Sequence, residues 1–427
     1  MRRLLFALIS LVLLATAMLF WLGLKADRAP HGRAPLVAAH LTDPVQRGAY
    51  LTVMGNCRAC HTAAGGTAYA GGRRIATQFG DFYSPNITPD KTTGIGSWTS
   101  DDFWRAMHEG RGKDGAFLYP VFPFPHYTRL SRADTDAIFA YLMDLPAHSL
   151  ENKSHQISFP FNQRWLMLIW RALYFRPGVY EMDAAQSPEW NLGAYLGTGL
   201  AHCASCHSPR NALGAAVSDH RSGGGVALGW YAPALDADRE AGVASWSEPE
   251  IIEFLQSGRT SHAAALGPMA EVVFESTQHW STSDLQALAK YLQSMPDQPA
   301  MAPQRRWTAD LDVREQRMFA GSEIYAEHCA GCHGDAGVDP NGDILALDGN
   351  RAVTMASSIN PIRTVLYGGY GPGTRGNPQP YGMPPFHMTL SDTEIADVLS
   401  FVRGSWNNQA GPVSEHEVRR QRTGPLW

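Results

Sequence analysis

The sequence has no long run of charge of one sign, and it has few cysteines. Its 427 residues carry a formal net charge of −5. This balance argues against a nucleic-acid partner, which requires clustered Lys and Arg. The six cysteines all lie in three short motifs, so none is left over for a disulfide. The chain is too long for one ordinary hydrophobic core, and about two to four domains are expected.

The N-terminus carries a long hydrophobic run. Leu4 to Leu24 contains no charged residue and follows Arg2 and Arg3. As a helix, this run spans about 30 Å, the thickness of the hydrocarbon core of a bilayer. The arginines favour the cytoplasmic side, which places the rest of the chain outside the cytoplasm. We expect residues 1–27 to form a transmembrane anchor. A cleaved signal peptide is the alternative, because Ala15 to Ala17 resembles a cleavage site.

All six cysteines belong to C-x-x-C-H motifs. The motif residues are Cys57, Cys60 and His61, then Cys203, Cys206 and His207, then Cys329, Cys332 and His333. This motif attaches c-type haem: the two thiols bond to the porphyrin edge and the histidine is the proximal iron ligand. Zinc is disfavoured because no second C-x-x-C lies near any motif. A redox-active cysteine pair explains neither the histidine nor the threefold recurrence. The sequence therefore predicts three haem c groups.

The segments around the motifs also repeat. Gly48 to Leu51 and Gly193 to Leu196 both read G-A-Y-L, and Gly321 with Tyr325 precedes the third motif more loosely. A glycine in such a helix lets a second helix cross closely. Apolar residues at helical spacing predict closing helices over 136–142, 285–292 and 395–402, with Ser131, Ser283 and Ser391 at or just before their N-caps. Middle helices are expected over 103–110, 251–258 and 362–368, each ended by a glycine.

These repeats predict an all-α chain of three tandem cytochrome c domains, preceded by one N-terminal transmembrane helix. The expected segments are an anchor at 1–27, the first domain at 40–150, an aromatic-rich bridge at 151–184, the second domain at 185–300, the third at 312–406 and a polar tail at 407–427.

Two loops supply candidate distal iron ligands. The ligand is expected in the loop before the closing helix, where Met383 lies in the third domain and Met269 in the second. A thioether on the iron fills the sixth position and raises the reduction potential. Met388 is a weaker competitor to Met383. Most methionines fill cores, but the shared position in two domains favours ligation.

The first domain has no methionine in this loop. In the stretch FLYPVFPFPHYTRLS, Phe122 stands where the ligand is expected. The repeat places Met107 in the core of the middle helix and Met143 at a helix end, which disfavours both. Two alternatives remain: His126 binds the iron, or the iron is open. An open iron would bind a small molecule such as carbon monoxide, as an enzyme acting on peroxide or nitrogen oxides would require.

Two further features carry expectations. The aromatic segment from Phe159 to Phe175 either lies in the bilayer interface or packs between domains. Pro209 and Pro340 are candidates to offer a carbonyl to the second ring nitrogen of His207 and of His333, respectively.

The chain resembles the tri-haem cytochrome c subunits of membrane-bound bacterial dehydrogenases over nearly its whole length. Besides the three motifs, the resemblance is carried by SPNITPD and TGIGSW at 84–98 and by LYPVFP at 118–123. The bridge FPFNQRWLMLIWRALYFRPG and SPEWN at 187–191 resemble the molybdenum aldehyde dehydrogenase branch. The alcohol dehydrogenase branch tends to show YPAMPY where this chain has YPVFPF, a departure that leaves the ligand of the first haem open.

The resemblance implies an electron-transfer subunit on the periplasmic side of the bacterial inner membrane. It implies a separate catalytic dehydrogenase subunit, an iron–sulfur small subunit, and ubiquinone or a terminal oxidase as electron acceptor. The alternatives are a cytochrome subunit of a quinoprotein alcohol dehydrogenase or flavoprotein gluconate or sugar dehydrogenase, a haem enzyme that uses an open first haem, and a subunit of a respiratory oxidase.

Overall fold

The computed structural model describes residues 37–217, 224–236, 240–296 and 311–422, with residues 14, 17, 18, 21, 34, 35 and 307. Most of the expected anchor at 1–27 lies outside the described residues. Within the described part of the chain, no helix combines the length and the apolar character that crossing a membrane requires. The chain divides into two compact units: Met1–Ser205 with Arg210–Val217, and Cys206–Pro209 with Ser218–Trp427.

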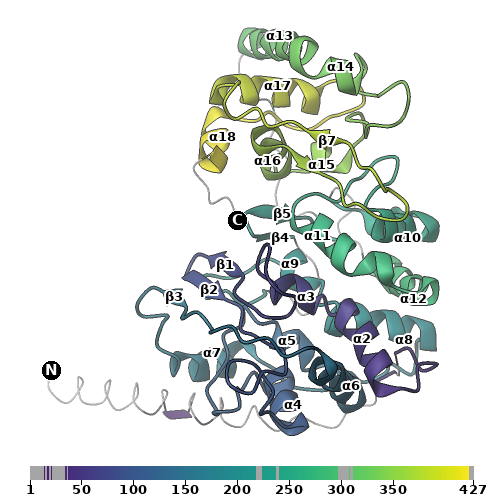
Figure 1. Cartoon of the computed structure of the whole chain (residues 1–427). Coiled ribbons are helices and arrows are strands. Elements are labelled where there is room, and N and C mark those ends of the chain that lie inside the picture. The colour runs from purple at the N-terminus through teal and green to yellow at the C-terminus, as the bar shows by residue number, and fades with distance from the viewer. Residues whose placement is uncertain are drawn as a thin grey trace, which may run out of the picture. The chain divides into compact units, whose positions relative to one another are not determined.

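Two helices cross at close range in the first unit. Helix α2 (Pro44–Met54) packs against α6 (Arg132–Asp144), and Figure 1 shows them side by side. A methyl group on Gly48 would overlap the Ala137 carbonyl, so only glycine permits this crossing. The haem-motif helix α3 (Cys57–Cys60), the middle helix α4 (Ser100–Glu109) and the short α5 (Phe124–Tyr127) complete this part.

A small sheet joins these helices. Strands β1 (Arg74–Thr77), β2 (Gly80–Tyr83) and β3 (Gln156–Ile157) form an antiparallel sheet in that order. The register pairs Ile75 with Phe82 and Asp81 with Gln156. The prediction of an all-α chain is correct for the helical frame but missed this sheet, because its strands are short and their alternation is weak.

The first unit also contains the start of the second predicted domain. After helix α7 (Leu166–Tyr174), α8 (Pro188–Tyr195) and the π-helix η1 (Leu196–Leu200) lead to α9 (Ala204–His207), whose last two residues belong to the second unit. The Tyr195 hydroxyl donates to the carboxylate of Asp134, which also pairs with Arg47. The side chains of Asp134 and Tyr195 are fully buried. This network fixes α8 to the crossing of α2 and α6, because a buried charge is stable only when it is paired and hydrogen-bonded.

The second unit begins with a hairpin and a helical layer. Strand β4 (Gly225–Ala227) pairs antiparallel with β5 (Trp230–Ala232). The helices that follow are η2 (Val243–Ser245), α10 (Glu248–Ser257), α11 (Pro268–Glu275), η3 (Thr277–His279) and α12 (Thr282–Gln293). Helices α10 and α12 pack together and bury Ile251, Leu255 and Leu288.

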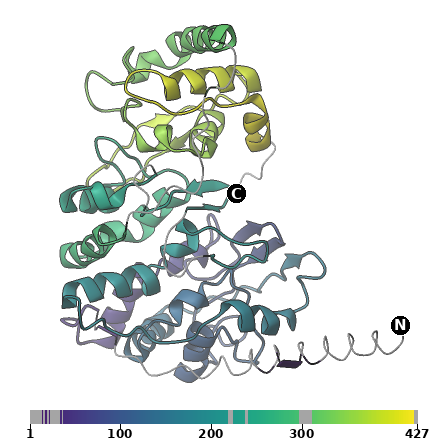
Figure 2. The same ribbon diagram turned by 180° about the vertical axis from the view of Figure 1, so that it is seen from behind.

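The rest of the second unit repeats the crossing. Helix α13 (Leu311–His328) packs along α17 (Asp392–Gly404), as the opposite views of Figures 1 and 2 both show. A methyl group on Gly321 would overlap the Asp397 carbonyl, just as at Gly48 in the first unit. The other elements are α14 (Ala330–His333), α15 (Arg351–Thr354), α16 (Ile359–Tyr367), β6 (Gly369–Tyr370), β7 (Gly382–Met383) and α18 (Glu415–Arg422).

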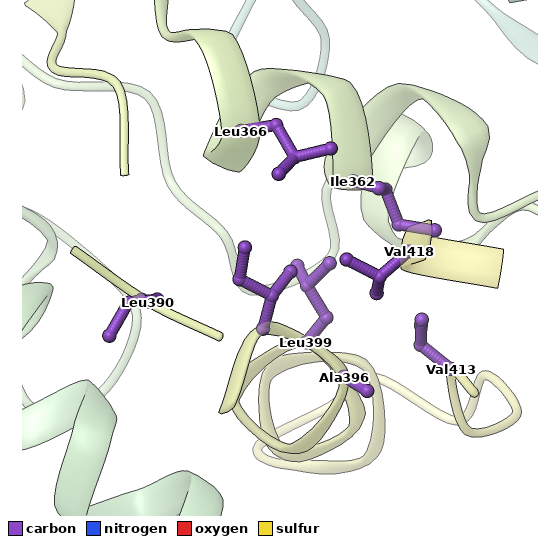
Figure 3. Packing of buried hydrophobic residues seen from close by; sticks show 8 residues of the cluster. Ile362, Leu366, Leu390, Ala396, Leu399, Val413 and Val418 are labelled. Atoms are coloured by element: carbon purple, nitrogen blue, oxygen red, sulfur yellow. The ribbon is translucent and has the colours of Figure 1, made fainter. Parts of the chain in front are cut away.

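The C-terminal segment belongs to a core, contrary to the prediction of a polar tail. Val413 and Val418 are fully buried beside Ile362, Leu366 and Leu399. Figure 3 shows these side chains converging from α16, α17 and the last segment. Two isolated valines in a charged stretch produce no helical period, which is why the sequence pattern did not predict this packing.

The helix ends follow the predicted chemistry with one correction. Ser131 and Ser391 cap α6 and α17, but the cap of α12 is Ser281, and Ser283 lies inside the helix. Gly110 and Gly258 end α4 and α10 in the left-handed conformation. Gly368 also ends α16 with a positive φ, but its ψ is extended, so the helix ends there without a left-handed cap.

Candidate haem-attachment sites

The first motif follows a sharp turn after α2. Asn56 takes a left-handed φ of 52°, and the chain then enters the one-turn helix α3. The backbone N–H of His61 donates to the Cys57 carbonyl at 2.9 Å, so the histidine continues the turn that carries both thiols. None of the six motif cysteines forms a disulfide. The motif therefore presents two sulfurs and one imidazole within a single helical turn.

The His61 ring is held by a carbonyl far away in the sequence. Its Nδ1 lies 2.8 Å from the carbonyl oxygen of Pro85, which follows β2. With Nδ1–H donating there, Nε2 carries the lone pair that can bind iron. Burial lowers the pKa of His61, although the Pro85 hydrogen bond opposes this shift. The site therefore favours the neutral imidazole, which is the form that binds a metal.

The second motif has the same construction. His207 Nδ1 lies 2.7 Å from the Pro233 carbonyl, and burial again lowers the pKa of His207. The expectation that Pro209 would supply this carbonyl is wrong. The backbones of these two histidines also accept similar hydrogen bonds. The Gly71 N–H donates to the His61 carbonyl at 2.7 Å, and the Gly224 N–H donates to the His207 carbonyl at 2.9 Å.

Sequence reasoning missed Pro85 and Pro233, although a signal was present. Each proline ends a Tyr-x-Pro run, Tyr83 to Pro85 and Tyr231 to Pro233, that begins within or at the end of a short antiparallel strand. The strand delivers the residue before the proline in extended conformation, which proline itself favours. The repeat lies about two dozen residues after each motif and is visible only when the strands are known.

The third motif is built differently. The Leu345 backbone interacts with the His333 ring, but within the described residues His333 Nδ1 makes no hydrogen bond. Pro340 does not fill this role, contrary to expectation. The Tyr325 hydroxyl instead donates to the Gly334 carbonyl at 2.6 Å and so holds the end of the motif turn. Burial lowers the pKa of His333, so here too the imidazole is neutral.

The thiols and their surroundings fit haem attachment. Burial raises the pKa of Cys57 to about 12 and that of Cys329 to about 11, whereas Cys60 and Cys332 are exposed. In the first and third motifs, one cysteine is thus more buried than the other, whereas Cys203 and Cys206 of the second motif are both half-buried. Among the described residues, no group of three or more His, Cys, Asp or Glu side chains could hold a metal ion by itself. Two sulfurs for the porphyrin edge and one neutral imidazole for the iron fit haem c better than a protein-only metal site.

The predicted distal methionines both lie in constrained loops. Met383 is half-buried on β7, where it pairs with Gly369, and a methyl group on Gly368 would overlap the Met383 carbonyl. Met269 is half-buried in the first turn of α11, after Gly267, which has a positive φ of 53°. Met388 is 86 % exposed, which disfavours it as the competitor of Met383. Ligation by Met269 and Met383 stays a prediction.

In the first domain, Phe122 belongs to an aromatic cluster. It packs with the buried side chains of Phe124, Trp170 and Phe175. His126 is half-buried on α5, and its Nδ1 lies 3.3 Å from the Thr198 carbonyl. This contact resembles the carbonyl contacts of the proximal histidines, which orient Nε2. His126 as the iron ligand stays a prediction.

Comparison with known proteins places these motifs in a family. The cytochrome c family model matches residues 45–146 and 319–406. The chain is 40% identical over 405 residues to the cytochrome c subunit of alcohol dehydrogenase (quinone) from Gluconobacter oxydans (strain 621H), which covers 90% of this chain and 84% of the relative. This chain belongs to the cytochrome c subunits of dehydrogenases.

Two other members of the family match over similar lengths. The cytochrome c subunit of gluconate 2-dehydrogenase from Pantoea cypripedii is 38% identical, with 86% of each chain covered. The cytochrome subunit of fructose dehydrogenase from Gluconobacter japonicus is 33% identical, with 91% of this chain and 85% of the relative covered. The chain is therefore a haem c electron-transfer subunit. The second motif lies outside both segments matched by the family model.

The bridge of this cytochrome subunit packs against the distal loop of the first domain. The guanidinium of Arg171 on α7 is fully buried, donates to the Glu109 carbonyl and lies over the rings of Phe117 and Phe175. The other face of the bridge stays open, with Phe159 80 % and Trp165 52 % exposed. Of the two expectations for this segment, packing within the protein holds for the inner face. The bilayer interface stays a prediction for the outer face.

Proposed function

We propose that this subunit carries electrons from a catalytic dehydrogenase subunit through three covalently attached haem c groups. The observation that carries this proposal is the repeated proximal geometry, His61 with Pro85 and His207 with Pro233, beside cysteines that form no disulfide. A bound haem supplies one-electron iron chemistry. The thiols would tether it, the Pro85 and Pro233 carbonyls hold His61 and His207 with Nε2 available, and Met269 and Met383 would fill two distal positions. A haem with both axial positions filled leaves no place for a substrate.

The catalytic partner is proposed to oxidise an alcohol, a sugar or a sugar acid. This class is supported by the names of the relatives, which are cytochrome subunits of alcohol, gluconate and fructose dehydrogenases. A molybdenum aldehyde dehydrogenase with an iron–sulfur subunit is the second candidate. It is favoured by the bridge at 159–178 and by Phe122 at the position where the alcohol branch tends to carry methionine.

The electrons are proposed to leave to ubiquinone, on the periplasmic side of the bacterial inner membrane. Support comes from the uncharged run Leu4 to Leu24 and from the exposed aromatic side chains of the bridge, Phe159 and Trp165. Tryptophan side chains such as Trp165 are enriched where a membrane meets water.

Co-purification from membranes tests the partner. The subunit is extracted in mild detergent through a C-terminal tag, and the retained chains and cofactors are identified. A chain that holds a quinone cofactor or flavin supports the alcohol or sugar class, whereas molybdenum with an iron–sulfur chain supports the second candidate. A haem–copper chain would overturn both and indicate a respiratory oxidase. Reduction of the bound haems by ethanol, gluconate, fructose or an aldehyde then identifies the substrate class.

A further inference from the structure

Two aromatic rings lie between the first and second haem motifs. The Tyr127 hydroxyl donates to the Gly55 carbonyl at 3.1 Å, two residues before Cys57. The Tyr127 ring meets the His202 ring edge-to-face, with centroids 5.4 Å apart, and His202 directly precedes Cys203. All these residues belong to the first compact unit. The pair therefore reaches from the start of one motif to the start of the next.

The surroundings of the pair leave little space. The Tyr127 side chain is buried and lies near the first motif: burial raises its pKa, and electrostatic interaction with Cys57 and Cys60 raises it further. The Gly55 backbone also interacts with the His202 ring. A methyl group on Gly55 would lie 3.3 Å from both the Cys57 sulfur and a methyl of Leu200, which is tighter than ordinary contact. The first motif and the residues that directly precede the second motif are thus packed against each other.

Aromatic pairs often only fill the space between helices, and Tyr180 with Tyr195 is such a pair in the same unit, at 5.8 Å. The Tyr127 and His202 pair differs in two ways. Each member is anchored to the backbone within two residues of a haem cysteine. His202 also has a positive φ of 42°, a backbone conformation that costs free energy for a side-chain-bearing residue and persists where the surroundings require it.

We propose that Tyr127 and His202 form the protein path for electron exchange between the first and second haem sites. This path rests on the proposed electron-transfer function. With haem held at both motifs, one electron would pass from a ferrous iron at one site to a ferric iron at the other, with no bond or proton exchanged, and the two rings would lie on its way. Electron exchange slows steeply as gaps open between the atoms that connect two centres. Two rings in contact, continuous with the backbone beside Cys57 and Cys203, keep such gaps small.

The test uses the full-length chain with all haems attached. Electrons are delivered in less than one equivalent by a pulsed reductant, and rapid-freeze EPR follows the ferric signals of the individual haems. Tyr127→Leu and His202→Leu are expected to slow the exchange between the first two haems by an order of magnitude or more. Tyr127→Phe keeps the ring and loses only the bond to Gly55, so an intermediate slowing is expected. Tyr180→Leu is the matched control and should exchange at the wild-type rate.

Reduction potentials and thermal unfolding are measured on the same variants. A leucine variant with unchanged exchange, or with no more slowing than Tyr180→Leu, overturns the path. Slowing that is fully explained by a shifted potential difference also overturns it. If a leucine variant does not fold, the exchange rates of Tyr127→Phe and His202→Phe test the path instead. An exchange rate in Tyr127→Phe equal to that of the wild type would contradict a role for the hydrogen bond to Gly55. Fewer than three covalent haems in the wild-type chain would instead contradict the proposed function itself.

Discussion

At the level of single residues, the prediction for the first haem site depends on Phe122 and His126. Because Phe122 lies in an aromatic cluster, no thioether is offered at the expected place. His126→Ala is expected to open the first iron, and a carbon monoxide difference spectrum of the reduced protein should then show a response of one haem. His387→Ala, at the corresponding place in the third domain, should show none. A full response in the wild-type chain would contradict ligation by His126 and favour an enzyme with an open haem.

Met383 and Met388 are a matched pair for testing the third site. Met383→Ala should lower the reduction potential of one haem and remove its sulfur-to-iron absorption in the ferric spectrum, because a thioether ligand raises the potential. Met388→Leu changes an 86 % exposed side chain and should leave both unchanged. Redox titration followed by absorbance measures both variants. The reverse result would transfer the ligand role to Met388.

Among the elements, the crossing helices depend on glycine. Gly48→Ala or Gly321→Ala forces a methyl group into the backbone of the partner helix. Overpacking of this kind typically costs about 1–3 kcal/mol, so thermal unfolding should occur several degrees lower. Gly178→Ala is the control, because a methyl group there meets no atom within 4 Å. Equal unfolding temperatures for Gly321→Ala and the control would show that α13 and α17 can move apart at little cost.

Three middle and closing helices begin with a capping carboxylate that responds to pH. Hydrogen bonds to Thr99, Ser247 and Ser391 lower the pKa of Asp102, Glu250 and Glu394, respectively. A lowered folded-state pKa adds stability above the pKa of the unfolded carboxyl, near 4, and that stability is lost as pH falls through the folded value.

A triple variant tests these caps: Asp102→Asn, Glu250→Gln and Glu394→Gln. It should unfold at a lower temperature at neutral pH. It should also lose less stability than the wild type on acidification from about pH 5 to pH 3, because three of the titrating caps are gone. Unfolding followed by circular dichroism across this range measures the slope. Glu253→Gln, an exposed carboxylate on α10, is the control. An unchanged slope in the triple variant would mean that the caps do not control acid stability.

For the whole molecule, the number of covalent haems is the decisive quantity. A pyridine haemochrome assay of the pure chain should give three equivalents bound through thioether links. Cys329→Ser combined with Cys332→Ser should give two, while the spectra of the remaining haems stay unchanged. Fewer than three equivalents in the wild-type chain would contradict the interpretation of at least one motif. The second motif is the most informative, because the family model does not cover it.

Much of the helical frame could be predicted because its signals are local. Serine caps, glycine stops and crossing glycines act within one turn, and Gly48, Gly110 and Ser131 took the expected roles. The N-cap of α12 was predicted two residues too late, at Ser283 instead of Ser281. Both serines suit a cap, and only the backbone conformation distinguishes them. The buried Val413 and Val418 were missed because their burial depends on side chains of α16 and α17, such as Leu366 and Leu399, that lie outside their own helical turn.

The sequence by itself determined the prediction of where haem attaches and which imidazole faces each iron, because two sulfurs and a histidine must lie within one helical turn to bind a single porphyrin. Only the tertiary structure decided what holds those imidazoles and what joins the sites. Pro85, Pro233 and the contact between Tyr127 and His202 involve residues that are far apart in the chain. Such contacts have no period and no motif, and they arise only when folding brings a carbonyl or a ring to its partner.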